Sequence, residues 1–341
     1  MFQRVKTGAK GQVWVSYVYD GKDENGKRRE IALGSDLLEA KRKWAELEGR
    51  KAPAEVGTMC GIFDRYERDV IPGKSPRSQK DNAGELKRLR AVFDNAPINS
   101  IEPYHIAQYL ENRAAKTRGN REISLLSHVW NKARAWGYTS KANPCIGIEK
   151  NKESRRSYYA DEAVFAAVYK HACIELQDAM DLAYLTAQRV SDVREMMLTD
   201  MVGDGLLVTP NKTKNSSAKK VRILLKENGV LTELGILVEK IKNRPRKVKS
   251  LYIIATPMGA KLTKWTLRAR WDKARKLAAD AIRDENPEFA EHIREFQFKD
   301  IRPKAASETD LAHAQVLLGH TKEQITKVVY QRVGETVRPT K

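Results

Sequence analysis

The sequence predicts a multidomain protein that is mainly α-helical and carries small β-sheets. At 341 residues the chain exceeds the usual size of one domain. Strand-forming residues gather near the N-terminus and again around 206–225, whereas apolar residues at helical spacing fill most of the remainder. A linker over 51–57 and a charged connector over 150–156 divide the chain into three parts.

Residues 1–50 are expected to form a strand-rich module. The stretch 13–19 is rich in Val, Trp and Tyr, which favour strands. A turn signal at Asn25-Gly26 precedes a returning strand over 28–33, and a helix then extends to about residue 48. A small sheet can place one face in a DNA groove. The alternative is an accessory or protein-contact module.

Residues 58–150 are expected to form a helical domain. Apolar spacing predicts helices over about 59–70, 78–95, 103–116 and 121–136. The basic residues that accompany these apolar stripes, and that are candidates for DNA binding, are Lys80, Lys87, Arg88, Arg90 and Arg121. Such basic faces are either solvated surface or a DNA-contacting surface, and the charge of the whole chain favours DNA contact.

The net charge of +19 and the isoelectric point of about 9.7 are typical of proteins that bind polyanions, nucleic acid before acidic membranes. The alternative is a basic protein without such a partner. No apolar run is long enough to span a bilayer, and no signal-peptide core is present, so no membrane association is expected. The three cysteines, Cys60, Cys145 and Cys173, are widely spaced, which predicts a reducing compartment without disulfides or a metal site.

Residues from about 156 to 341 are expected to mix helices with short strands. Apolar spacing predicts helices over about 161–176, 179–186, 231–242 and 263–283. Strand formers predict strands over 206–209, 221–225 and 251–255. The segment that joins the first two strands is rich in lysine and contains Lys212 and Lys214.

This third part also carries side chains suited to phosphate chemistry: Arg189, Lys299, Arg302, His320 and Tyr330. Each has an ordinary interpretation when taken alone, such as an ion pair of Arg189 with Asp192, surface charge, a satisfied polar residue or a core tyrosine. Together, two arginines can bracket a phosphodiester and stabilise its transition state. A lysine or histidine can move protons, and a tyrosine hydroxyl can attack phosphorus. This chemistry requires neither a metal nor ATP.

The order of these residues resembles the tyrosine recombinases, and within them the phage-type integrases. The segments that carry the resemblance are Thr186-Ala-Gln-Arg189-Val-Ser-Asp192, the lysine-rich segment after residue 209, Lys299-Asp-Ile-Arg302, Leu318-Gly319-His320 and Tyr330. The resemblance implies catalytic roles for Arg189, Lys212, Lys299, Arg302 and His320, with Tyr330 as the nucleophile and Lys214 as a rival to Lys212.

Two departures from the family pattern concern the last part of the chain. Lys299 replaces the first histidine of the family's His-x-x-Arg box, and lysine is a poorer general base at neutral pH because its ordinary pKa lies near 10. Lys299 is therefore expected either to act as a base or to contact phosphate. The spacing from His320 to Tyr330 is one residue longer than in many members. Tyr330 remains the candidate because no other tyrosine follows His320.

The resemblance also implies an organisation and a function. Residues 1–50 correspond to an arm-binding-like module, 58–150 to a helical core-binding domain and 156–341 to an α+β catalytic domain. The expected function is site-specific recombination of DNA through a covalent 3′-phosphotyrosine intermediate, integrating or excising a mobile element. A type IB topoisomerase-like enzyme and a catalytically decayed DNA-binding regulator are the alternatives.

The resemblance implies partners as well. These are double-stranded DNA attachment sites, further copies of the chain that form a tetramer in synapsis, and accessory DNA-bending or directionality proteins. Members of the family act on DNA in the cytoplasm of a bacterial host, and the same location is expected here. The tail over 334–341 is expected to pack against a neighbouring subunit.

Overall fold

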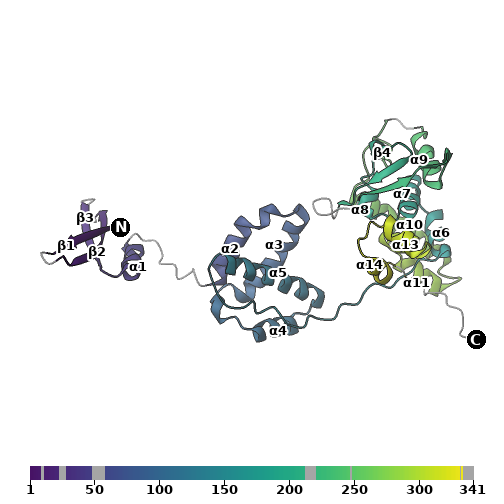
Figure 1. Cartoon of the computed structure of the whole chain (residues 1–341). Helices are drawn as coiled ribbons and strands as arrows, with labels where there is room; N and C mark the ends of the chain where they lie inside the picture. The colour runs from purple at the N-terminus through teal and green to yellow at the C-terminus, as the bar shows by residue number, and fades with distance from the viewer. Residues whose placement is uncertain are drawn as a thin grey trace, which may run out of the picture. The chain divides into compact units, whose positions relative to one another are not determined.

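The structure is a computed structural model that describes residues 1–8, 11–22, 28–47, 58–211, 220–245, 248–330 and 332. The chain divides into two compact units, Met1–Ser154 and Arg155–Lys341 (Figure 1). The expected fold class, mainly α with small antiparallel sheets, is confirmed. Within the described part of the chain, no helix combines the length and apolar character needed to cross a membrane.

The N-terminal part of the first unit is a three-stranded antiparallel sheet with one helix. Its elements are β1 (Phe2–Thr7), β2 (Val13–Lys22), β3 (Arg28–Gly34) and α1 (Leu37–Leu47), with β2 in the centre of the sheet. Val18, Leu33 and Ala40 are buried where α1 packs on the sheet. The sequence did not predict β1, because its mostly polar residues lie exposed on an edge strand and lack a clear apolar alternation.

The rest of the first unit contains four helices in its described residues. They are α2 (Met59–Asp69), α3 (Pro76–Phe93), α4 (Pro103–Asn112) and α5 (Lys116–Ala135). Phe63, Leu89 and Trp130 belong to one buried core between these helices. The expected helix over 103–116 ends at Asn112, and the next helix begins at Lys116 rather than at residue 121. Residues 113–115 between them are not helical.

The second unit packs helices around two small sheets (Figure 1). Its strands are β4 (Met201–Val202), β5 (Gly205–Val208), β6 (Val221–Leu224), β7 (Lys226–Glu227) and β8 (Val230–Leu231), in the orders β4-β5-β6 and β7-β8. Its helices are α6 (Glu162–Lys170), α7 (Ile174–Thr186), α8 (Val190–Val193), α9 (Glu233–Lys242), α10 (Lys264–Ile282), α11 (Pro287–Glu295), α12 (Ile301–Ser307), α13 (Leu311–Leu317) and α14 (Glu323–Val329). Trp271 and Phe296 are among the large side chains of its core.

Two expectations about the second unit were wrong, and one helix had not been predicted. The helix predicted over 161–176 ends at Lys170, and α7 starts again after Cys173. The stretch 251–255 forms no continuous strand among the described residues. It makes isolated bridges, Tyr252 with Met197 and Ala255 with Lys261. Helix α11 was not anticipated; it begins at an Asn-Pro pair, where Asn286 caps the first turn.

Candidate active site

Small buried residues allow three helix ends of the second unit to approach closely. Ala187, Ala305, Ala306, Ala314 and Leu318 form one buried cluster, and the half-buried Tyr330 packs against it. These residues come from the end of α7, from α12 and from the end of α13. The same segments carry the two arginines and the histidine that the sequence singles out, and Tyr330 reaches them from the end of α14, so the cluster lies directly beneath the site.

A sharp turn after α7 places Arg189. Ala187 ends the helix with a φ of 49°, the left-handed conformation, and Arg189 follows in an extended conformation as the first residue of α8's N-terminal turn. The Thr186 hydroxyl donates to the Leu182 carbonyl at 2.5 Å, and the Gln188 amide donates to the Leu317 carbonyl at 2.7 Å. The turn is thereby attached to both α7 and α13.

Arg302 is the buried centre of the site, with 4% of its surface exposed. Its Nη1 donates to the carbonyl of Ala187 at 2.6 Å, and its Nη2 donates to the carbonyl of Leu318 at 3.1 Å. Burial lowers the pKa of Arg302 to about 10; Arg189 acts in the same direction, whereas Tyr330 opposes the shift. Arg302 therefore remains charged at neutral pH and joins the ends of α7 and α13.

The Leu-Gly-His segment is the C-terminal cap of α13. Gly319 adopts a φ of 67°; its N–H donates to the Val316 carbonyl, and the N–H of His320 donates to the Gln315 carbonyl, both at 3.0 Å. This pair of hydrogen bonds is a Schellman motif, which needs a residue at home in the left-handed region. The glycine thus turns the chain so that His320 points back towards α12.

His320 is buried and neutral at pH 7. Its Nε2 lies 3.4 Å from Nη2 of Arg302, and its Nδ1 lies 2.9 Å from the hydroxyl of Thr326. Because a guanidinium can only donate, Nε2 is the acceptor, and Nδ1 carries the proton that it donates to Thr326. Burial, followed by the charges of Arg302 and Arg189, lowers the pKa of His320 to about 4.

Tyr330 lies directly after α14 and faces the same centre. Its ring centre is 5.0 Å from that of His320 and 5.0 Å from the guanidinium carbon of Arg302. Tyr330 is half-buried, so its ring packs on the site without being enclosed by it. The longer spacing between His320 and Tyr330 therefore does not separate the two side chains.

Arg189 and Asp192 form a loose pair beside this centre. Arg189 Nη1 lies 4.0 Å from Asp192 Oδ2, and 27% of the Arg189 side chain is exposed, whereas Asp192 is buried. The other oxygen of Asp192 accepts from the backbone N–H of Asn211 at 3.1 Å. Asp192 therefore holds the residue that precedes Lys212, and among the described residues Arg189 has only this loose ion pair. Lys212 and Lys214 lie outside the described residues.

Lys299 is exposed, whereas Arg302 is buried. Lys299 lies on a 3-10 turn, Phe298–Asp300, and its exposed side chain lines a pocket of about 440 Å³ together with Val190 and Trp271. Among the residues that the structure describes, no hydrogen bond or ion pair engages Lys299. The 3-10 turn continues directly into α12 at Ile301, so Lys299 and Arg302 lie on one continuous helical stretch and differ in burial.

Sequence reasoning did not find Gln188 and Thr326. Gln188 follows the left-handed Ala187 and holds the end of α13, and Thr326 fixes the proton on His320. Only the position of Gln188 beside Arg189 and of Thr326 between His320 and Tyr330 could have indicated these roles. Their function depends on contacts between helices, which no periodic pattern shows.

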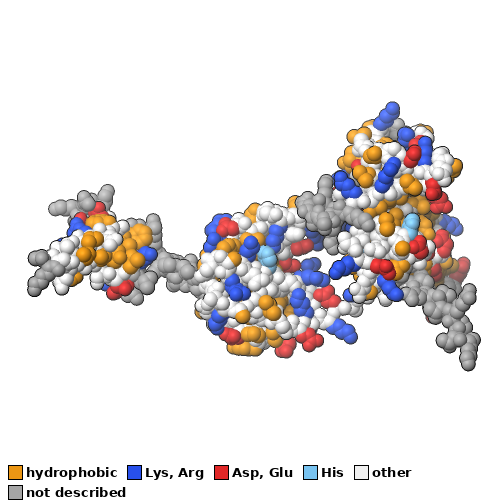
Figure 2. Space-filling view, in the orientation of Figure 1, with side chains coloured by type: hydrophobic (Ala, Val, Ile, Leu, Met, Phe, Trp, Pro, Cys, Tyr) orange, Lys and Arg blue, Asp and Glu red, His pale blue; other side chains and the backbone are white. Residues whose placement is uncertain are grey.

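The candidate DNA-binding residues of the first unit differ in their surroundings. Lys80, Lys87 and Arg88 are exposed on α3. Arg90 instead contacts three carboxylates at 2.6 to 2.9 Å, and Arg121 pairs with Glu153 at 3.0 Å. Figure 2 shows Lys and Arg side chains spread over one face of this helical part, with acidic side chains among them. The contacts of Arg90 favour a structural role for it.

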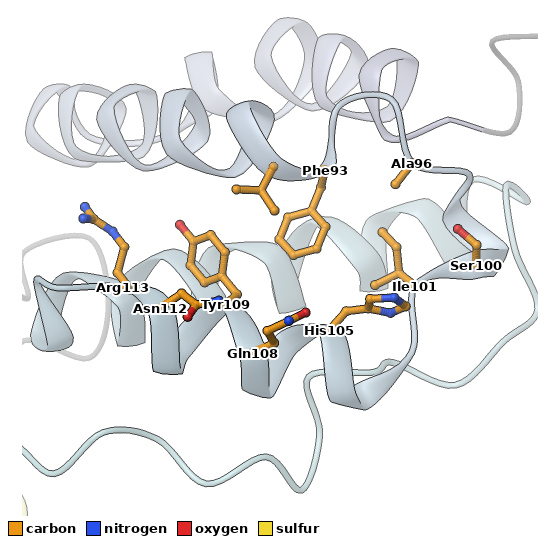
Figure 3. A pocket seen from close by; sticks show the side chains of 10 residues that line it. Phe93, Ala96, Ser100, Ile101, His105, Gln108, Tyr109, Asn112 and Arg113 are labelled. Atoms are coloured by element: carbon orange, nitrogen blue, oxygen red, sulfur yellow. The ribbon is translucent and has the colours of Figure 1, made fainter.

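The first unit also has a pocket of about 340 Å³ between α3 and α4 (Figure 3). Phe93, Ile101 and Tyr109 line it, with His105 and Arg113 at its two ends. Arg113 donates to the buried carboxylate of Glu122 at 2.9 and 3.0 Å, so its charge is already paired. This largely apolar pocket lacks the set of donors and nucleophile that the second unit brings together.

Comparisons with known proteins agree with the arrangement of the second unit. Residues 159–336 match the phage integrase family. The integrase of Enterobacteria phage 434 is 28% identical over 277 residues, which is 78% of this chain and 74% of that protein. The integrase of Escherichia phage lambda is 28% identical over 276 residues, with the same two coverages.

Solved structures of lambda integrase share the fold. A dimer bound to a COC′ core site matches with a TM-score of 0.65 and 20% identity, covering 99% of this chain and 97% of that one. A tetramer bound to a Holliday junction matches with a TM-score of 0.64 and 20% identity, covering 98% and 97%. Because the family match spans more than half of the 341 residues, the chain belongs to the phage integrase family and is a site-specific recombinase of the tyrosine type.

Proposed function

We propose that Tyr330 is the nucleophile of this recombinase and that Arg189 and Arg302 bind the phosphate it attacks. The phenol oxygen forms a bond to phosphorus as the bond to the 5′-oxygen breaks, which leaves the DNA joined to Tyr330 as a 3′-phosphotyrosine. Two guanidinium groups stabilise the added negative charge of the transition state. Their fixed geometry supplies what metal ions supply in other phosphoryl transfers.

Cleavage moves two protons, one from the Tyr330 phenol and one to the departing 5′-oxygen. Neutral His320 accepts the phenol proton at Nε2, because its lowered pKa leaves this nitrogen unprotonated at neutral pH. The departing 5′-oxygen takes a proton from Lys212 or from Lys214. Lys299 lies exposed beside the site and contacts the DNA backbone rather than acting as the base. The reverse reaction, with a new 5′-hydroxyl attacking the phosphotyrosine, returns both protons.

One observation carries these assignments: the buried Arg302 contacts both His320 and Tyr330. A hydrogen-bonding distance of 3.4 Å to the imidazole and 5.0 Å to the phenol ring place three reactive groups around one point. The test is a suicide duplex, whose cleaved end diffuses away and leaves the covalent adduct. The wild-type protein should accumulate an adduct and Tyr330→Phe should bind the duplex without forming one. An adduct in Tyr330→Phe contradicts the assignment.

Supercoil relaxation and the suicide-duplex assay together separate the recombinase from its alternatives. Relaxation of supercoiled DNA without sequence preference would indicate topoisomerase-like action. Sequence-specific binding without any adduct from the wild-type protein would indicate a decayed regulator. Neither alternative is supported by the family match or by the relatives, which carry the name integrase.

The lysine that protonates the leaving group can be identified with a modified substrate. A 5′-bridging sulfur is a good leaving group without protonation, so it bypasses the general acid. Of Lys212→Ala and Lys214→Ala, the variant that lacks the acid should cleave ordinary DNA slowly and the sulfur substrate at the wild-type rate. Lys299→Ala should show the same modest loss on both substrates, because a phosphate contact does not depend on the leaving group.

We further propose that three functional regions act on attachment-site DNA. Residues 1–50 would bind accessory arm sequences, 58–150 would bind the core site and 156–341 would carry out strand transfer. Lambda integrase has been solved as a dimer on a core site and as a tetramer on a Holliday junction. We propose that this chain likewise forms a tetramer when two attachment sites are brought together. Accessory DNA-bending proteins would bend the DNA of these sites. Mass measurements of complexes on a four-way junction test for the tetramer.

A further inference from the structure

The chain segment that follows Tyr330 is attached to the rest of the unit by Arg332. Nη1 of Arg332 donates to the backbone carbonyl of Tyr158 and to Asp300 Oδ1, the latter at 3.2 Å. Only 12% of the Arg332 side chain is exposed, and the Asp300 side chain is fully buried. An arginine two residues past the proposed nucleophile is thus anchored in the interior.

Ser307 makes a second attachment on the same segment. Its hydroxyl donates to the Tyr330 carbonyl at 3.1 Å and accepts from the Arg332 backbone N–H at 2.8 Å. One side chain therefore contacts the backbone on both sides of residue 331. Ser307 is the last residue of α12, and Arg302 lies near the first. A single short helix thus carries both the phosphate-binding arginine and the group that holds the nucleophile's backbone.

Asp300 fixes the other end of this arrangement. Its carboxylate accepts from Arg156 at 2.8 to 3.1 Å and from the backbone N–H of Gln297 at 3.0 Å, in addition to Arg332. Asp300 directly precedes α12, so the buried carboxylate is tied to the helix that carries Arg302. Removing one partner of this buried carboxylate would leave its charge incompletely compensated, so the contacts of Asp300 with Arg156 and Arg332 are expected to persist in the folded protein.

We propose that Ser307, Arg332 and Asp300 form a positioning clamp that sets the distance between Tyr330 and Arg302 within one subunit. A nucleophile must reach its phosphorus within a few tenths of an ångström of the productive geometry, and a loop-borne residue achieves this only when its backbone is held. The clamp supplies that restraint on the side of Tyr330 that faces the C-terminus. This inference rests on the proposed role of Tyr330 as nucleophile.

The test uses single-turnover adduct formation on the suicide duplex. We expect Arg332→Ala and Ser307→Ala to lower the rate at saturating DNA by about 10- to 100-fold. The DNA concentration at half-saturation should stay within twofold of wild type, because neither residue contacts DNA in this proposal. Ser307→Thr keeps the hydroxyl and should restore most of the rate. Arg283→Ala, which removes an exposed arginine of the same unit, is the matched control and should change neither value.

A spectroscopic readout reports the position of Tyr330 directly. Labelling the protein with 3-fluorotyrosine gives fluorine resonances for its 12 tyrosines, and Tyr330→Phe identifies the one from Tyr330 by its loss. In Arg332→Ala and Ser307→Ala, that resonance should move towards the free amino acid value and sharpen, while most others stay in place. An unmoved Tyr330 resonance, or a shift of all resonances together, overturns the clamp. Ser307→Ala decides the question if Arg332→Ala does not fold, because it leaves the buried ion pairs intact.

The outcomes also distinguish this inference from the proposed function. If the wild-type protein forms no adduct, or if Tyr330→Phe forms one, the role of Tyr330 fails. If the adduct depends on Tyr330 but Arg332→Ala and Ser307→Ala react at the wild-type rate, only the clamp fails. A rate loss in Ser307→Ala that Ser307→Thr does not restore also contradicts the clamp, because the hydroxyl would then be irrelevant.

Discussion

The guanidinium carbon of Arg302 lies 5.0 Å from the centre of the Tyr330 ring, and the same guanidinium donates to two helix-end carbonyls. The cation that is to bind phosphate is therefore in place beside the nucleophile before DNA arrives. Electrostatic groups that are held in advance lower an activation barrier more than groups that must reorganise.

Arg302→Lys should retain DNA binding and lose most cleavage. A lysine ammonium cannot reproduce the planar fork that reaches the carbonyls of Ala187 and Leu318 together with His320. We expect the rate of adduct formation to fall by about 100- to 1000-fold. The measurement is single-turnover cleavage beside a gel-shift titration. A variant that cleaves within threefold of wild type would show that charge alone is sufficient at this position.

Gly319→Ala should destabilise the second unit and displace His320. At a φ of 67° a Cβ costs about 1 to 2 kcal/mol, and relaxing the cap moves the imidazole away from Arg302. Gly84→Ala is the control: this glycine lies within helix α3, with nothing within 4 Å of an added Cβ. It should stabilise the protein by about 0.5 to 1 kcal/mol. Urea unfolding of both variants measures the change in the free energy of unfolding, which should be a decrease for Gly319→Ala and an increase for Gly84→Ala.

The lowered pKa of His320 predicts a pH-dependent stability. The unfolded imidazole binds a proton near its ordinary pKa of about 6.5, whereas the folded one does so only near 4. Between these values the unfolded state holds more protons, so the free energy of unfolding falls as pH drops. Between pH 6.5 and 5, the free energy of unfolding of His320→Gln should therefore fall by on the order of 1 kcal/mol less than that of the wild-type protein. Parallel slopes for wild type and variant would contradict the lowered pKa.

Lys87→Ala and Arg90→Ala should act differently although both residues lie on α3. Lys87 is exposed, so its loss should weaken DNA binding and reduce the salt dependence by about one unit of slope. Arg90 neutralises Asp64, Glu67 and Asp94, so its loss should lower stability by about 1 to 2 kcal/mol. Thermal unfolding and salt-dependent gel shifts separate the two effects. An unchanged melting temperature in Arg90→Ala would assign Arg90 to DNA contact.

The fold class, the family and the recombinase activity were predicted from the amino-acid sequence, and these predictions are confirmed. It could do so because helices follow from apolar spacing and because several reactive residues in a fixed order form a specific pattern. The roles of Arg189, Arg302, His320 and Tyr330 stay predictions until cleavage is measured. Lys212 stays the predicted general acid with Lys214 as its rival, because both lie outside the described residues.

Which of these side chains meet one another depends on how distant segments of the chain pack together. Arg302 and Lys299 are three residues apart on one helical stretch, yet Arg302 is buried between helix ends and Lys299 is exposed. Arg332 follows Tyr330 closely in sequence, but its importance depends on Asp300, which precedes it by 32 residues. Local patterns record the helix on which a residue lies. The partner that it finds across the core depends on packing between distant segments, which no local pattern contains.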